Sequence, residues 1–162
     1  MPTFNPAPII SLADKIVTDI NAATWTPAGV GQTALVFTAR RVYFLPPYLP
    51  TDSDLHVDIL PAEDSDEELA DRGPTYERDF VILLCVNKVL ASRTSNAESD
   101  ALTNFTYALA TFYDLQEEFV VTGSQRSHCI DRAVNLIYDP AEIDKNGRFY
   151  SAIALKFKGW YS

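Results

Sequence analysis

The spacing of apolar residues along the chain predicts two amphipathic helices. The first covers residues 10–22, where apolar side chains recur every three or four positions, as on the buried face of a helix. Ser11, three residues before Asp14, approximates a capping box at its start. The second covers residues 97–118, and its core stripe consists of Ala101, Leu102, Phe105, Leu109, Phe112 and Leu115.

The segments between and after these helices have the pattern of β-strands. Residues 34–44 are rich in β-branched and aromatic side chains. In residues 55–60, Leu55, Val57 and Ile59 alternate with His56, Asp58 and Leu60, and this second strand is expected to end at Pro61. A third strand begins near Tyr76 and is apolar on both faces through Val86, which predicts a strand covered on two sides. Two more strands are predicted at 132–138, where Asp139-Pro140 ends the run, and at 149–157.

The element order is therefore α-β-β-β-α-β-β, which predicts a single α+β domain over residues 1–162. We expect a mostly antiparallel sheet of about five strands packed with two main helices. A turn is expected at Gly29 and Gly31, which lack the third glycine and the lysine of a phosphate-binding loop.

The charge of the chain is concentrated in one window. The formal net charge is -9, from 22 acidic and 13 basic side chains. Nine acids and no Lys or Arg lie between Val42 and Asp71: Asp52, Asp54, Asp58, Glu63, Asp64, Asp66, Glu67, Glu68 and Asp71. Residues 62–74 hold little that can pack, so a mobile acidic loop is predicted there. This loop is either a solvated feature, or a face for a basic neighbour or for a passage through which DNA slides.

The C-terminal segment is basic and aromatic. Lys145, Arg148, Lys156 and Lys158 follow Asp144 with no acid among them. Trp160 and Tyr161 then place large apolar surface where chain ends usually fray, so residues 158–162 dock either on their own domain or on another copy.

The residues give little indication of catalysis. Cys85 lies in an apolar run and is expected to be buried. Cys129 with His56, or Ser127 with His128, would lack a third orienting group, and a zinc site at His128 and Cys129 would lack two ligands. We therefore predict no catalytic residue, no metal and no cofactor. No apolar run approaches the ~20 residues that cross a bilayer, so no membrane partner is expected.

The order of four stretches resembles the tail terminator (tail completion, or neck) proteins of tailed bacteriophages. They are the helix LADKIVTDINAA at 12–23, the strand and proline exit FTARRVYFLP at 37–46 followed by LHVDILP at 55–61, the central strand ERDFVILLCVNK at 77–88, and the closing strand RFYSAIALKF at 148–157. Where that family often has basic residues after the second strand's proline, this chain has Ala62-Glu63-Asp64.

The resemblance implies a structural virion protein and not an enzyme. Such a subunit forms a hexameric ring that caps the tail tube, with the tail tube protein on one side and a head-side connector or neck protein on the other. Genomic DNA passes through without specific binding. The protein would be assembled in the host cytoplasm and reside in the tail or neck of the virion.

A ring of identical subunits needs two different, complementary patches on each subunit. We expect the acidic lobe of one copy, residues 52–71, to face Lys156 and Lys158 of the basic segment of the next copy. Alternatively, acids of the same loop, or Glu117 and Glu118, line the lumen. The predicted interface residues are Asp64, Asp66, Glu67, Glu68, Tyr43, Tyr48, Lys156, Lys158, Trp160 and Tyr161. The alternatives are another neck component such as a head-tail connector or stopper, a small hydrolase or nuclease regulator, and a monomeric binding module.

Overall fold

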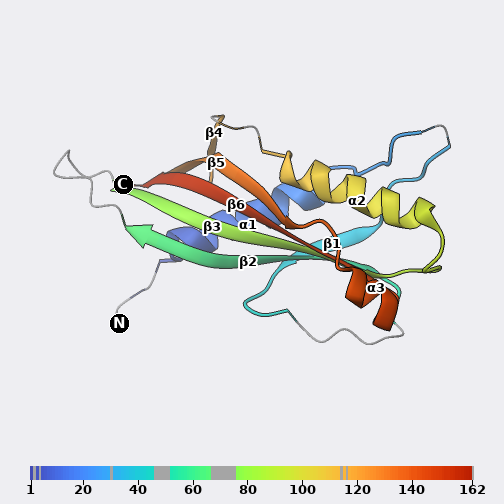
Figure 1. Cartoon of the computed structure of the whole chain (residues 1–162). Coiled ribbons are helices and arrows are strands. Elements are labelled where there is room, and N and C mark those ends of the chain that lie inside the picture. The colour runs from blue at the N-terminus through green and yellow to red at the C-terminus, as the bar shows by residue number, and fades with distance from the viewer. Residues whose placement is uncertain are drawn as a thin grey trace.

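The computed structural model describes residues 1, 3, 5–29, 31–45, 52–66, 76–113, 115 and 117–161. Three helices lie in this part of the chain: α1 (Pro8–Ala22), α2 (Asn96–Ala110) and α3 (Pro140–Asn146). The strands are β1 (Phe37–Arg41), β2 (Leu55–Asp66), β3 (Tyr76–Val89), β4 (Glu118–Val120), β5 (Gln125–Leu136) and β6 (Arg148–Tyr161). The predicted α+β class is confirmed (Figure 1).

All six strands form one sheet in the order β1-β2-β3-β6-β5-β4. β1 runs parallel to β2, and every other neighbouring pair is antiparallel, so the predicted mostly antiparallel sheet is confirmed. β3 and β6 pair without interruption from Tyr76↔Tyr161 to Val89↔Arg148. Residues 158–161 thus lie between β3 and β5, which places the C-terminal segment on its own domain.

The hydrophobic core lies between one face of the sheet and two helices. α1 contacts β1 and β2, whereas α2 contacts β5 and β6. Alternate strand residues supply the other side of the core, among them Ile59, Ile82 and Ile153, which are fully buried. Burying a side chain of this size contributes about 1.5–3 kcal/mol, so helix placement follows from the apolar stripes.

The opposite face of the sheet carries no long helix among the described residues, and the prediction that β3 is covered on two sides is confirmed only for its second half, where Cys85 and Asn87 of this face are buried. Phe80 and Ile82 face the helices and are buried, but Val81 and Leu83 on the other face are only half-buried. Leu83 lies opposite Ala154 and Val81 opposite Lys156, so cross-strand neighbours cover them in part. We call this surface the helix-free face.

The first helix begins two residues earlier than predicted, and the predicted capping box is wrong. Its N-cap is Ala7, with Pro8 in the first turn, and Ser11 lies inside the helix. Proline suits this position because its fixed φ is helical and its missing N–H would have had no partner there.

The second helix ends at Ala110, eight residues before the predicted end. Thr111 Oγ1 donates to the carbonyls of Tyr107 and Ala108 at the last turn. Phe112 and Tyr113 then leave the helix, and the Tyr113 ring packs 5.0 Å from Phe119 and 5.5 Å from Phe157, between ring centroids. Their apolar character therefore reflects an aromatic cluster and not a continued helical stripe.

Two strands extend beyond their predicted bounds. β2 continues through Pro61 to Asp66, so residues 62–66 belong to a strand and not to the predicted loop; residues 67–74 of that loop lie outside the described residues. A register shift between Pro61 and Glu63 marks a bulge, and β1 does not extend past Ile59 of β2, so this proline lies in an edge segment that tolerates a missing N–H. β5 starts at Gln125, well before residue 132, and β4 was not predicted.

The third helix was also not predicted, although its sequence signals are present. Asp139 caps it by accepting from the N–H of Ala141 at 2.9 Å, and Pro140 occupies the first turn. Gly147 ends it with φ +60°, a conformation that glycine adopts without steric cost. Asp139-Pro140 therefore starts a helix, whereas β5 already ends at Leu136, two residues before the predicted strand end at 138.

Gly159 of β6 provides a test of this packing. A Cβ built there would lie 2.5 Å from Cε2 of the buried Phe80 ring, whereas a Cβ at Gly123 meets nothing within 4 Å. We expect Gly159→Ala to lower the free energy of unfolding by about 1–3 kcal/mol. Gly123→Ala should change it by less than about 1 kcal/mol. Urea denaturation measures both, and equal effects would contradict the close packing of Phe80 on Gly159.

Candidate interaction surface

The segment around β1 exposes large apolar side chains. Tyr43 and Phe44 leave 67% and 71% of their surface exposed, Leu45 is also exposed, and Val36 before the strand is 89% exposed. Tyr43, one of the predicted interface residues, is therefore accessible to a partner. Single exposed apolar residues are ordinary, but a run of three adjacent ones is typical of a contact surface.

Arg41 orients the first of these side chains. Its Nη1 donates to the hydroxyl of Tyr43 at 2.7 Å, and its guanidinium carbon lies 5.3 Å from the centroid of the Tyr43 ring. The Nε of Arg41 donates to Asp14 of α1 at 2.6 Å, and this hydrogen bond raises the pKa of Arg41. Tyr43 is thus held in place, whereas Phe44 beside it remains the more exposed ring.

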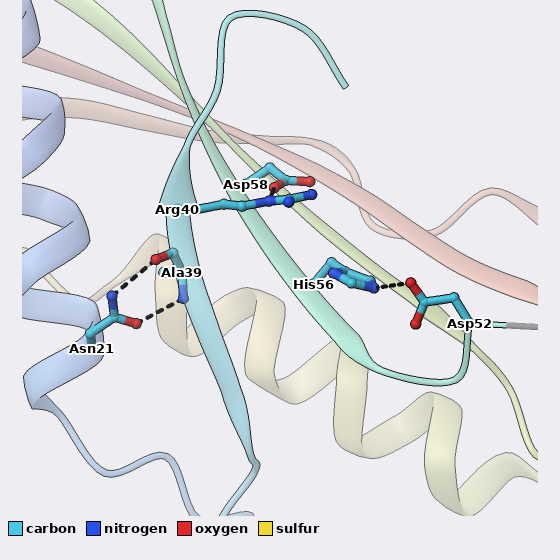
Figure 2. Close-up of polar contacts among 6 residues, drawn as sticks. All are labelled: Asn21, Ala39, Arg40, Asp52, His56 and Asp58. Atoms are coloured by element: carbon cyan, nitrogen blue, oxygen red, sulfur yellow. Dashed lines mark hydrogen bonds and ion pairs between the residues drawn. The ribbon is translucent and has the colours of Figure 1, made fainter. Parts of the chain in front are cut away.

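A side chain from α1 closes the outer edge of β1. Asn21 Nδ2 donates to the carbonyl of Ala39 at 2.9 Å, and the N–H of Ala39 donates to Asn21 Oδ1 at 2.7 Å (Figure 2). An edge strand with free backbone groups invites pairing with another chain. Because the two groups of Ala39 are already bonded, a second strand cannot pair with the centre of β1 without displacing Asn21, which favours contacts through side chains.

A polar network lies on the helix-free face next to β1. Arg40 Nε donates to Asp58 at 2.8 Å, and Asp58 is completely buried (Figure 2). His56 Nε2 lies 2.8 Å from Asp52, which also accepts from the N–H of Asp54 at 3.0 Å. The pKa of Asp52 is lowered, first by this backbone hydrogen bond and then by His56. A buried carboxylate is stable only with such partners, so the network fixes β1 on β2.

Two further polar contacts lie on β3 and β6 of the same face. Cys85 Sγ lies 3.6 Å from the hydroxyl of Tyr150, and Arg148 donates to the side chain of Asn87. Burial raises the pKa of the Cys85 thiol and of the Tyr150 hydroxyl. Cys85 is buried, as predicted, and is held as a neutral thiol and not as a nucleophilic thiolate.

The dyads considered from the sequence are not assembled. Cys129 lies on the helix-covered face of β5 and is buried, whereas His56 lies on the helix-free face of β2. Ser127 is buried and donates to the carbonyl of Lys158 at 2.9 Å. His128 instead stacks on Trp160, with ring centroids 4.9 Å apart. Within the residues the structure describes, no three His, Cys, Asp or Glu side chains are grouped to hold a metal ion.

The predicted basic patch is paired within its own chain. Lys156 Nζ lies 3.0 Å from Asp79, and Lys158 Nζ lies 2.5 Å from Glu77; both acids are on the neighbouring β3. The sequence spacing could not reveal these partners, because the register of β3 against β6 decides them. Both lysines are predicted interface residues, and both already have an acidic partner on their own sheet. Their charges therefore do not require an acidic residue of a neighbouring copy.

The predicted acids lie in different surroundings. Asp64 accepts from Arg78 at 3.0 Å on the adjacent strand, and the backbone of Asp66 pairs with Arg78. Glu117 is exposed, and Glu118 of β4 accepts from Arg126 at 2.7 Å. Glu67, Glu68 and Tyr48 lie outside the described residues.

The predicted aromatic residues of the C-terminal segment belong to β6. Trp160 is half-buried and stacks on His128, and the backbone of Tyr161 pairs with Tyr76 and Gln125. Of the two possibilities predicted for this segment, the backbone of residues 158–161 follows the first, docking on its own sheet; residue 162 lies outside the described residues.

An apolar groove between α2 and the segment before β1 was not predicted. It encloses about 230 Å³ and is lined mainly by Trp25, Pro27, Leu35, Ala101, Phe105 and Ala108, with Thr26, Ala28 and Asn104. Trp25 is fixed there by its Nε1, which donates to the carbonyl of Ile20 at 2.9 Å, and by the Phe105 ring at 5.3 Å. We call this the Trp25 groove. A tryptophan beside a Pro/Gly segment was the sequence signal for it.

No model of a known protein family matches the chain, and no curated protein matches it. No helix in the described part of the chain is long and apolar enough to cross a membrane.

The clamp on β1 can be tested with Asn21→Ala. This change leaves the N–H and carbonyl of the buried Ala39 without their partner, which should cost about 1–3 kcal/mol of unfolding free energy. Asn104→Ala on α2 is the matched control, and it should cost less than about 0.5 kcal/mol because alanine favours an exposed helix position. Chemical denaturation of both variants is the measurement, and an Asn21→Ala protein as stable as the control would refute the clamp.

The two thiols should react slowly in the folded protein. Burial is the main cause that raises the pKa of Cys85 and of Cys129 above the ordinary 9.0, so folding lowers the thiolate fraction at pH 8. Alkylation by iodoacetamide, measured by mass spectrometry, should be roughly tenfold faster or more in the denatured protein than in the folded protein. In the folded protein, the alkylation rate should rise only when the pH is raised above 8. An added exposed thiol, Ala97→Cys, should react at the denatured rate throughout. Rapid labelling of either native thiol at pH 8 would contradict this.

Proposed function

We propose that this chain is a structural virion protein, a tail terminator that forms a hexameric ring. The ring caps the tail tube and joins the tail to the head-side connector or neck protein, and the genomic DNA passes through it without specific binding. The protein then resides in the tail or neck of the virion after assembly in the host cytoplasm. The resemblance of the four sequence stretches supports this proposal, as does the α+β fold.

The exposed run of Tyr43, Phe44 and Leu45 carries the proposal. Side chains of this kind supply most of the binding energy where proteins meet, since burying one aromatic ring contributes about 1.5–3 kcal/mol. The bonded edge of β1 beside them favours a contact through side chains, which leaves each subunit's sheet intact. A surface that is apolar and exposed in the single subunit suits a repeated building block.

The charge of the chain supports the role of a conduit. The formal net charge of -9 repels DNA phosphates, so a ring of such subunits gives the genome a passage to which it does not adhere. Glu117 is exposed and is the stronger of the two candidates for the lumen, since Glu118 is engaged by Arg126.

Electron microscopy of particles assembled without this protein tests the proposal. Tails that have no terminator should be over-long or should lack heads, and supplying the wild-type chain should restore joined tails of uniform length. Rings of the purified chain, or of the chain bound to tail tips, should be six-fold. Twelve-fold rings would identify a head-side connector instead, and normal joined tails without the protein would refute the role.

A further inference from the structure

The Trp25 groove has the size and lining of a receptor for one aromatic ring. Its volume is about 230 Å³, and an apolar cavity of roughly 150 Å³ is enough to bind benzene. The groove is already formed, because Trp25 is hydrogen-bonded to Ile20 and packs against Phe105 and Phe112 at 5.3 and 5.1 Å between ring centroids. A preformed apolar site binds with little loss of conformational entropy.

The chain exposes a ring that fits this groove but cannot reach it in the same molecule. The groove includes Leu35, just before β1, whereas Phe44 follows the far end of that strand. Five strand residues span about 16 Å, so β1 separates the two. Tyr43 is held by Arg41, which leaves Phe44 as the ring available for insertion.

One pair of exposed, oppositely charged side chains lies near the ring and the groove: Arg40 of β1 and Asp100 of α2. Arg41 and Glu98 are already paired with Asp14 and Lys88 of the same chain. Asp100 is exposed next to Ala101 of the groove, and half of the Arg40 side chain (49%) remains exposed beside Asp58. Charges arranged in this way favour one orientation of two docked copies.

From this complementarity we infer that Phe44 of one copy inserts into the Trp25 groove of the next copy. The inference rests on the proposed ring and specifies its subunit contact. The two halves are different surfaces of one chain, so the contact is head-to-tail, which is the type that closes into rings. Phe44 is the anchor, and Arg40 and Asp100 lie at the rim.

Trp25 fluorescence reports on the groove directly. The chain has two tryptophans, so in Trp160→Phe protein the emission comes from Trp25 alone. A synthetic peptide of residues 36–45 should change this emission with saturation. A peptide with Phe44→Ala should bind at least about tenfold more weakly, because it lacks the buried ring. Calorimetric titration of the wild-type chain gives the affinity without any substitution.

Paired variants on α2 separate groove occupancy from general damage. Ala108→Phe fills the groove and should abolish peptide binding, whereas Ala97→Phe, the same change at an exposed site outside the groove, should leave it intact. No saturable signal with the wild-type peptide, or equal loss in both variants, would overturn the inference.

Assembly of the full chain distinguishes this inference from the proposed function. Light scattering should show that Phe44→Ala and Ala108→Phe reduce ring formation, while Tyr138→Ala, which removes another exposed aromatic ring, does not. If six-fold rings persist in both the Phe44→Ala and the Ala108→Phe proteins, the Phe44 contact is overturned and the terminator role still stands. Peptide binding in the groove, combined with normal joined tails in particles without the protein, would support the contact and refute that role.

Discussion

The pairing of β6 with both β3 and β5 is the interaction on which the structure depends. β6 occupies the interior of the sheet, so it joins the β1-β2-β3 part to the β5-β4 part, and each part carries one of the long helices. Its residues Ile153, Leu155 and Phe157 are fully buried beneath these helices. Contacts between residues as far apart as Val81 and Lys156 must form before the core is complete, which makes folding cooperative and dependent on long-range contacts.

The parts of the fold that were predictable are those in which burial alone decides the structure. The helical stripe of α1 and the apolar β3 segment follow directly from the period of their buried residues. Prediction failed where another contact overrides the period. Phe112 continues the apparent stripe of α2 but packs against Trp25, and Pro61 interrupts the alternation of β2 but lies where β1 has ended.

The candidate surface was predictable to a smaller extent. Exposure of Tyr43 follows from its position between a strand and a proline run, but the partners of Lys156 and Lys158 depend on register, which sequence spacing does not contain. The Trp25 groove depends on how α2 meets the segment before β1, and such a meeting of distant segments has no periodic signature. By contrast, the signals for α3 are present in the sequence: Asp139 and Pro140 mark a helix start, and Gly147 marks its end.

The two hydrogen bonds between Asn21 and Ala39 have a consequence for crowded conditions. A sheet whose outermost strand offers free amides can grow by accretion, one molecule after another, into a fibril of indefinite length. With both backbone groups of Ala39 bonded by Asn21, an added strand would have to displace this side chain to pair with the centre of β1, which disfavours growth at this edge.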